Sequence, residues 1–310
     1  REVQMNTANI KCYAPQARND FMQAVARRLN LLGIATDKKG ELLISDVVID
    51  GSVMQIAGNS FDASMAESRN KLVKHTQKQG FNQFVEHTAY TWFNRFCAIR
   101  FMELHDYLEH GHRVLSHPSK DNGFEILDHA QDVAEELGLN RDHIVELKLA
   151  GNKDEQLYRE LLTGQCHKLH QAMPFLFEAL DDETELLLPD NLTRTDSLLR
   201  GLVNDIPEQD WQQVEIIGWL YQFYISEKKD EVIGKVVKSE DIPAATQLFT
   251  PNWIVKYLVQ NSVGRKWCQT YPDSTIKSEM EYYIEPAEQT DEVNAELKAI
   301  TPDSIDPETI

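Results

Sequence analysis

Residues 84–104 read FVEHTAYTWFNRFCAIRFMEL, the most apolar stretch of the chain. At helical spacing its apolar side chains fall on nearly every face instead of forming one stripe. They include Ala89, Trp92, Phe93, Phe96, Ile99 and Met102. A helix of this kind is buried on most sides, so we expect 84–104 to be the central helix of a mainly α-helical domain. Arg95 and Arg100 lie within it. Because an isolated buried charge is very costly, each must pair, extend to the surface or face a groove.

The residues before this stretch predict a second helix and a small β element. Residues 16–32 place apolar side chains on one face, namely Phe21, Val25, Leu29 and Leu32. Gly33 follows as a typical helix C-cap. Residues 41–56 alternate apolar and polar side chains around Asp50-Gly51, which indicates a short β-hairpin. The predicted fold class is therefore mainly α, with a possible small β-hairpin.

The chain is long enough for one large domain or two ordinary ones, and it is strongly acidic. Its 310 residues contain 31 Lys and Arg against 50 Asp and Glu, a formal charge of −19. A module that binds duplex DNA is usually basic, because neutralising phosphates dominates its affinity. This balance favours protein contacts over naked DNA for most of the surface. Residues 279–310 hold ten acidic residues against the single Lys298, a composition typical of a linker.

The cysteines and the apolar runs bear on the cellular compartment. Cys12, Cys97, Cys166 and Cys268 are too scattered to form a metal or redox pair, and Cys97 reads as a small buried hydrophobe. No stretch resembles a secretory signal, and no apolar run is long enough to span a bilayer. We expect a cytoplasmic chain with reduced thiols and no membrane partner.

Histidines cluster in HDYLEHGHRVLSHP, residues 105–118. The four are His105, His110, His112 and His117. Zinc requires ligands that converge tetrahedrally, and a His-Gly-His step could supply two of them. However, the cluster has no pair of histidines four apart with a neighbouring carboxylate, and no cysteine. Ordinary loop histidines are favoured over a metal site, and we assign no metal ligand.

No catalytic residue can be assigned from sequence. Cys166-His167 with His170 could supply a nucleophile and a base, but adjacent residues on a helix point in different directions. Neither a G-x-G-x-x-G nor a G-x-x-x-x-G-K phosphate loop is present.

Residues 246–258, TQLFTPNWIVKYL, combine a Phe-Thr-Pro step with an apolar helical run. Pro251 suits the first helical position, and Thr250 can supply an N-cap hydroxyl. Ile254, Val255 and Leu258 form one apolar stripe. Taken alone, this stretch predicts only a well-formed helix start.

Four segments together carry a resemblance to a known family. They are IIGWLYQ (216–222), QLFTP (247–251), WFNRFCAIRFMEL (92–104) and MNTANIKCYAPQARNDF (5–21). The first three resemble the adenine-specific DNA methyltransferases, which include the modification subunits of Type I restriction systems and the fused restriction–modification enzymes. In that family a helical domain ends in an "lG-x-x-Y-e/q" helix, and a Q-x-F-T-P step follows. The fourth strengthens the resemblance to the branch found in BREX phage-defence systems.

The resemblance implies a division of the chain into three parts. Residues 5–230 would form a helical N-terminal domain, 231–278 the start of a methyltransferase domain, and 279–310 an acidic linker-like segment. A Rossmann-like methyltransferase domain would follow. The resemblance also implies double-stranded DNA as the substrate of the full protein.

In the family, the Phe-Thr-Pro step lines the S-adenosylmethionine pocket. The resemblance therefore implies that Phe249, Thr250 and Pro251 bind this cofactor. A helix N-terminus and a threonine hydroxyl suit the carboxylate of the methionine moiety, and Phe249 can cover an apolar part of the cofactor.

Two motifs of the family are missing from these residues. The D-P-A-C-G-S-G-like cofactor loop does not occur, nor does the N-P-P-Y-like motif that holds a flipped adenine. We therefore expect these residues to be inactive alone. One alternative is an interaction module that docks other BREX proteins or a phage-encoded inhibitor. Another is an acidic decoy of nucleic acid, which the interleaved basic residues Arg69, Lys71, Lys74 and Lys78 disfavour.

Overall fold

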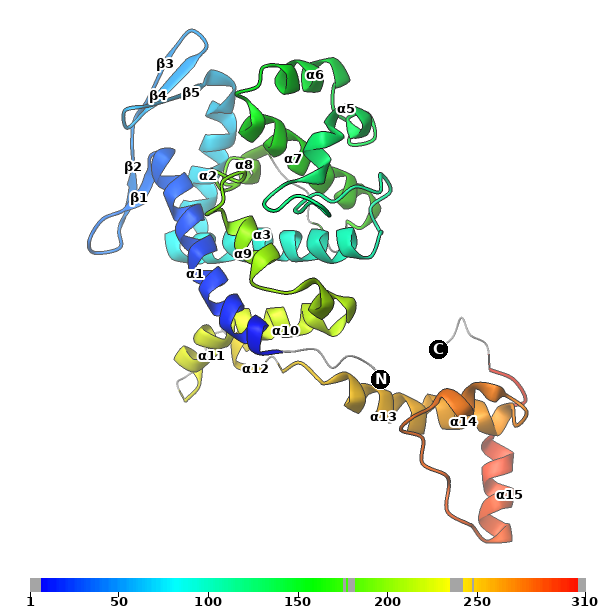
Figure 1. Cartoon of the computed structure of the whole chain (residues 1–310). Coiled ribbons are helices and arrows are strands. Elements are labelled where there is room, and N and C mark those ends of the chain that lie inside the picture. Colours follow the sequence, from blue (N-terminus) through cyan, green and yellow to red (C-terminus); the bar gives the residue numbers. More distant parts are fainter. Residues whose placement is uncertain (1–6, 175–176, 178–181, 235–241, 247, 306–310) are drawn as a thin grey trace. The chain divides into compact units, whose positions relative to one another are not determined.

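The computed structural model describes residues 7–174, 177, 182–234, 242–246 and 248–305. The chain divides into two units, Arg1–Gln247 and Leu248–Ile310 (Figure 1). Several residues named above lie outside the described residues: Met5 and Asn6 of the N-terminal segment, Gln247 of QLFTP, 235–241 at the predicted start of the methyltransferase domain, and 306–310 of the acidic segment.

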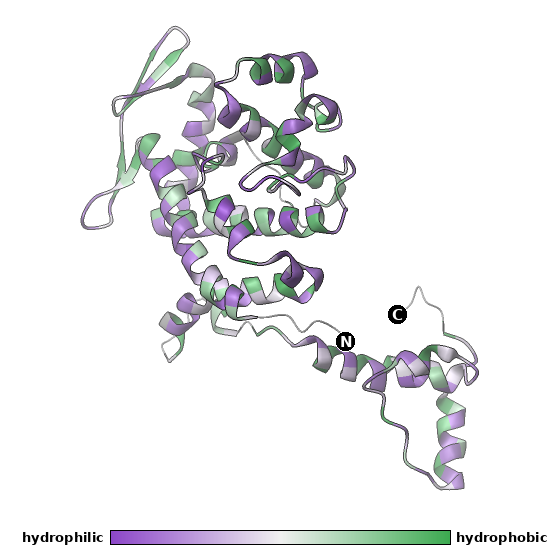
Figure 2. Ribbon diagram, in the orientation of Figure 1, coloured by the Kyte–Doolittle hydropathy of each residue, from purple (hydrophilic) through white to green (hydrophobic). Residues whose placement is uncertain are grey.

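The first unit is mostly helical. Its α-helices are α1 (Thr7–Leu31), α2 (Ala66–Gln79), α3 (Phe81–Leu104), α4 (Glu125–Asp128), α5 (Ala130–Val133), α6 (Arg141–Leu149), α7 (Asp154–Ala172), α8 (Asp182–Glu185), α9 (Leu198–Asn204), α10 (Glu215–Tyr224), α11 (Ser226–Val232) and α12 (Ile242–Thr246). Single 3-10 turns occur at Ala63–Met65 and Glu208–Gln212. Hydrophilic and hydrophobic residues alternate along most of these helices (Figure 2), as expected where one side of a helix is buried. The predicted fold class is confirmed.

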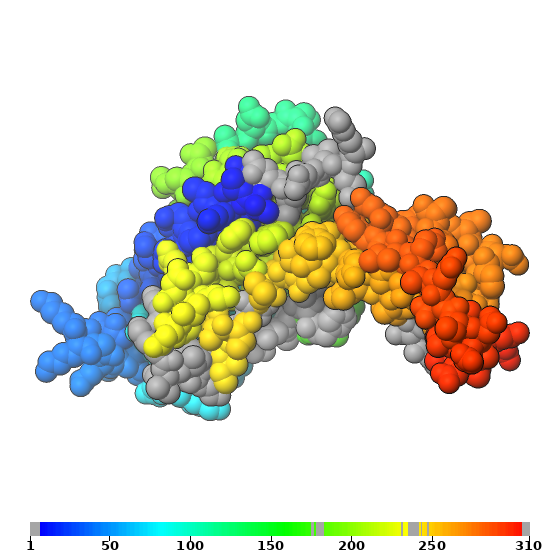
Figure 3. Space-filling view, turned by 90° about the horizontal axis from the view of Figure 1, so that it is seen from below, coloured from blue at the N-terminus to red at the C-terminus, as the bar shows by residue number. Residues whose placement is uncertain are grey.

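Helix α3 is the centre of the first unit, as predicted from its apolar faces. Trp92, Phe96 and Ile99 are each 0 % exposed. Helix α1 packs on one side, where Phe21 meets Phe93 edge-on at a centroid distance of 5.8 Å. Helix α10 packs on another, where Tyr224 stacks on Phe93 at 4.3 Å. The space-filling view shows α1 and α10 side by side although they are far apart in sequence (Figure 3).

Helix α1 begins at Thr7, nine residues before the predicted start, and continues through Pro15. Proline lacks the N–H that would bond the carbonyl of Lys11, which usually breaks a helix. Lys11 is exposed, so water can satisfy that carbonyl, while the neighbouring Ala14 and Ala17 are buried in the core. Burial of the residues around Pro15 therefore outweighs the lost hydrogen bond.

Two small antiparallel sheets follow α1. Strands β1 (Ile34–Thr36) and β2 (Leu42–Ile44) form the first. Strands β3 (Val47–Asp50), β4 (Val53–Ile56) and β5 (Asn59–Asp62) form the second, in the order β3-β4-β5. The predicted hairpin is present as β3–β4, where Asp50 pairs with Val53 around a turn that contains Gly51 at φ +59°.

The junction between α1 and the sheets is tightly packed around Gly33. Its φ of +71° is in the left-handed region, and an added Cβ would lie 2.5 Å from Cγ2 of Ile56. Arg69 of α2 ties this junction together by donating to the carbonyls of Leu32 at 2.9 Å and Ser45 at 2.8 Å. Arg69 is only 4 % exposed, so it is a structural residue.

The two arginines of α3 both have partners in the fold. The guanidinium of Arg95 lies over the ring of Trp92, 5.0 Å from its centroid. Arg100 pairs with Glu103 at 2.5 Å, and both side chains are almost completely buried. Arg100 also donates to Ser116 Oγ at 2.8 Å. Of the three expected solutions (pairing, extending to the surface or facing a groove), Arg100 is paired.

The second unit contains α13 (Asn252–Asn261), α14 (Val263–Thr270) and α15 (Asp291–Ile300), with a 3-10 turn at Thr275–Glu279. Asn261 connects its parts by donating to Tyr282 O at 2.7 Å and accepting from Ile284 N at 2.8 Å. Helix α15 lies in the predicted linker-like segment, and none of its residues is buried. Among the described residues, no helix is both long and apolar enough to cross a membrane.

Candidate functional site

The Phe-Thr-Pro step begins the second unit. Phe249 and Pro251 are half-buried, and Thr250 is exposed. Helix α13 begins at Asn252, and Pro251 is its N-cap with φ −53° and ψ 142°. The carbonyl of Pro251 accepts from Ile254 N at 3.0 Å. The predicted N-cap at Thr250 and first helical position at Pro251 are therefore wrong by one residue, because the extended ψ of Pro251 keeps it outside the helix.

Helix α13 presents its N-terminus and an exposed apolar surface. The first N–H groups of a helix have no intrahelical acceptor and carry partial positive charge, which suits an anion. Leu248 at 73 % and Trp253 at 56 % are exposed near this end, and Val255 at 43 % and Leu258 at 56 % are exposed further along the helix. Of the predicted stripe, Ile254 is half-buried, whereas Val255 and Leu258 are exposed. This end of the helix can hold a molecule with an anionic group and an apolar part.

The IIGWLYQ segment lies on α10, in the first unit. Ile216 and Leu220 are buried. Tyr221 meets Tyr90 of α3 at a centroid distance of 5.4 Å, and both line a cavity of about 480 Å³. The Arg18–Glu86 ion pair, at 2.6 Å, lines the same cavity. This segment therefore packs α10 against the core and forms one wall of a partly aromatic cavity.

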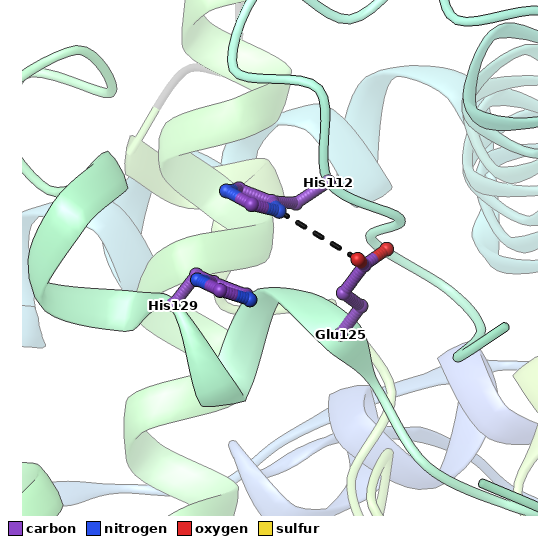
Figure 4. Close-up of side chains that lie close together, drawn as sticks. All are labelled: His112, Glu125 and His129. Atoms are coloured by element: carbon purple, nitrogen blue, oxygen red, sulfur yellow. Dashed lines mark ion pairs between the residues drawn. The ribbon is translucent and has the colours of Figure 1, made fainter. Parts of the chain in front are cut away.

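The four predicted loop histidines do not have equivalent surroundings. Three hydrogen-bond to other parts of the fold: His105 to Trp211 O at 2.8 Å, His110 to Gln165 Oε1 at 2.7 Å, and His117 to Asp128 Oδ2 at 3.3 Å. His112 instead lies beside Glu125 and His129 (Figure 4). Its Nδ1 is 3.7 Å from Glu125 Oε1, and its ring stacks on that of His129 at a centroid distance of 3.9 Å.

Part of this cluster is visible in the sequence as a Glu–His pair at helical spacing. Glu125 and His129 are four residues apart in EILDH, so a helical turn places both on one side. The backbone bond from His129 N to Glu125 O, at 3.3 Å, shows that this turn forms. A search restricted to pairs of histidines four apart overlooks a Glu–His pair.

The Cys166-His167 pair is not arranged as a nucleophile and base. Burial raises the pKa of the Cys166 thiol to about 12, so the thiol stays protonated at neutral pH. His167 is directed to Glu185 Oε1 at 2.6 Å, and His170 to Phe177 O at 2.6 Å. Cys166 is a core residue of α7.

Two curated proteins are similar to nearly the whole chain, although no model of a protein family matches it. The adenine-specific methyltransferase BrxX of Escherichia coli O9:H4 (strain HS) is 68 % identical over 307 residues, which cover 99 % of this chain and 26 % of that protein. The adenine-specific methyltransferase PglX of Lacticaseibacillus casei (strain Zhang) is 38 % identical over 289 residues, 87 % of this chain and 24 % of that protein.

Over most of its length the chain is similar to the aligned quarter of these adenine-specific methyltransferases. The resemblance noted in the sequence is thereby confirmed at the level of the family. The chain spans about a quarter of the length of these relatives.

Proposed function

We propose that this chain is part of an adenine-specific DNA methyltransferase that uses S-adenosylmethionine to mark host DNA in BREX phage defence. The observation that carries the proposal is the 68 % identity to BrxX over 99 % of the chain. Double-stranded DNA is the proposed substrate of the full protein. Because the family's glycine loop and Asn-Pro-Pro motif are missing from these 310 residues, the chain by itself is proposed to be inactive.

Within that enzyme, the first unit is proposed to be a rigid helical body. The proposal rests on its continuous core around α3, which includes Trp92, Phe96 and Trp211 at 0 % exposure. The second unit is proposed to contact the cofactor through Phe249, Thr250 and Pro251. The exposed hydroxyl of Thr250 and the N-terminus of α13 would bind the carboxylate of the methionine moiety, and Phe249 would contact an apolar part.

A chimera tests the function. The matched quarter of Escherichia coli BrxX is replaced by this chain, and adenine methylation of genomic DNA is measured in cells that carry the remaining defence genes. We expect methylation comparable to that of parental BrxX, because a 68 % identical segment should preserve the buried contacts. BrxX with the matched quarter deleted is the negative control. A chimera that is folded and abundant but methylates no adenine would contradict the proposal.

The proposed contact between the Phe-Thr-Pro step and the cofactor is tested in the same chimera. Because Pro251 and not Thr250 caps α13, Thr250→Ala should change stability by less than ~0.5 kcal/mol, as expected at an exposed site. If Thr250 binds the cofactor carboxylate, losing this hydrogen bond costs about 1.5–3 kcal/mol. The affinity for S-adenosylmethionine then falls roughly ten- to a hundred-fold.

Calorimetric titration of the chimera with S-adenosylmethionine measures that loss. Thr250→Ser keeps the hydroxyl and should restore most of the affinity. Ser262→Ala is the matched control, since it removes another exposed hydroxyl of the second unit and should leave affinity unchanged. A Thr250→Ala variant that binds the cofactor as tightly as the parent would mean that Phe-Thr-Pro is only a helix start.

A further inference from the structure

We propose that His112, Glu125 and His129 form a binding site for a divalent transition-metal ion, with Zn²⁺ as the first candidate. One ligand atom from each residue lies within 4.8 Å of the others. Imidazole nitrogens and a carboxylate oxygen are a ligand set that zinc accepts at roughly 2.0–2.2 Å. Tetrahedral coordination at that distance needs ligand atoms about 3.3 Å apart. The two rings are stacked with an interplanar angle of 6°, so both must rotate out of this stack to direct one nitrogen each at a shared ion.

Backbone hydrogen bonds hold the segments that carry the three residues next to one another. The N–H of Glu125 donates to Ser116 O at 2.9 Å, and the N–H of Ile126 donates to Arg113 O at 3.0 Å. These bonds hold the loop that carries His112 against the start of α4. His129 directly follows α4, one helical turn beyond Glu125. A ligand set held together by backbone hydrogen bonds loses little chain entropy when an ion binds.

Neighbouring groups orient His112 and Glu125 toward each other. His112 N–H donates to Nδ1 of His110 at 3.1 Å, and His110 Nε2–H donates to Gln165 Oε1 at 2.7 Å. Both nitrogens of His110 are thus used, so it supports the site and is not a ligand. The N–H of Arg113 donates to Oε2 of Glu125 at 2.8 Å, and Oε1 faces His112.

The carboxylate of Asp132 lies where it can orient the imidazole of His129. Asp132 Oδ2 lies 3.5 Å from Nδ1 of His129, which leaves the other ring nitrogen for the ion. Such carboxylate–histidine pairs commonly surround zinc and raise the basicity of the ligand. Figure 4 shows the two imidazole rings face to face, with the Glu125 carboxylate beside His112.

The charges at the cluster favour a cation. Burial works to raise the pKa of Glu125, but the Arg113 N–H and the nearby His112 outweigh it, and the pKa lies below its ordinary value. The carboxylate is therefore ionised at neutral pH. A divalent ion bound to the two rings would lie beside this negative charge.

With three protein ligands, the ion would retain one position for water. The side chains of His112 and Glu125 are 25 % and 19 % exposed, so both the ion and a water molecule can reach them. The ion would fasten the histidine loop to α4 and α5, a structural role that requires no catalytic activity. This inference is independent of the proposed function.

The test uses the 310-residue chain after treatment with a chelator. Calorimetric titration with Zn²⁺ should show one saturable site per chain, and Zn²⁺ should raise the melting temperature. His112→Asn and His129→Asn should each weaken binding by at least ~100-fold, since loss of a supporting partner alone costs roughly 10–100-fold. Asp132→Asn should weaken it by about ten-fold.

His143→Asn is the matched control, because His143 also pairs with a glutamate, Glu160, at 3.1 Å but belongs to no group of three metal-ligating residues in the described part of the chain. Its affinity for Zn²⁺ should equal that of the parent chain. A parent chain without a saturable site, or a folded His129→Asn variant that binds equally well, would overturn the proposal.

Cobalt provides a second measurement that does not depend on any variant. Co²⁺ bound by two imidazoles and a carboxylate should show weak visible d–d bands and no thiolate charge-transfer band. A strong thiolate band would place the ion at cysteine, Cys12 or Cys268 being the more accessible thiols, and would likewise overturn the proposal.

Discussion

Replacing Glu103 by alanine should lower the free energy of unfolding by about 3–5 kcal/mol, because it leaves the buried Arg100 without its closest counter-charge. The Glu103 side chain is completely buried, and its carboxylate accepts hydrogen bonds from four donors. They are Arg100 Nη1 at 2.5 Å, Val114 N at 2.7 Å, Leu115 N at 2.7 Å and Ser116 Oγ at 3.0 Å. No water can replace the lost oxygens at such a depth without repacking.

Urea unfolding of the chain, followed by far-UV circular dichroism, measures this loss. Glu109→Ala is the matched control, since it breaks the ion pair with Lys168 at the surface, where Glu109 is 73 % exposed. Water readily solvates the Lys168 ammonium, so this control should unfold almost like the parent. Equal losses for the buried and the surface glutamate would contradict the account of Glu103 as the anchor of the loop after α3.

Gly33→Ala should lower the free energy of unfolding by about 2–5 kcal/mol. A left-handed backbone costs a residue with a Cβ roughly 1–2 kcal/mol. Crowding a packed site adds about 1–3 kcal/mol. Both contributions apply here, because φ is +71° and the new methyl group would lie 2.5 Å from Ile56 Cγ2 and 2.8 Å from Ser45 Cβ.

Gly58→Ala separates the two contributions. Gly58 also has a positive φ, +84°, but an added Cβ would meet no atom within 4 Å. It should therefore show only the backbone cost of roughly 1–2 kcal/mol. If the two variants unfold at the same urea concentration, the contact between Gly33 and β4 does not constrain the junction of α1 with the sheets.

The central helix could be predicted from sequence because its signal is local and redundant. Every face of the helix 84–104 carries large apolar side chains, so it must be buried whichever elements pack against it. The β3–β4 hairpin was predictable for a similar reason, since alternation and the Asp50-Gly51 pair indicate the same turn. Helix boundaries were less accessible. Local propensity places a stop at Pro15, whereas burial of Ala14 and Ala17 continues α1 through it.

The histidine cluster illustrates a different limit. The pair Glu125 and His129 is encoded by spacing along one helical turn. The addition of His112 depends on backbone hydrogen bonds between residues 113–116 and 125–126, whose register the sequence does not reveal. The shifted cap of α13 is a smaller case of the same kind. Thr250-Pro251 is a good helix start in composition, and only ψ at Pro251 decides which residue begins the helix.

Two of the four cysteines are buried, so the other two are the sites at which a thiol reagent can attach. Cys97 and Cys166 are in the core, where burial raises the pKa of each thiol well above its usual range and suppresses its reactivity. Cys12 is exposed in the first unit, and Cys268 is partly exposed in the second. Dyes coupled to the 310-residue chain would therefore mark one position in each unit without any engineered cysteine. Energy transfer between the two dyes would report the distance between these two positions.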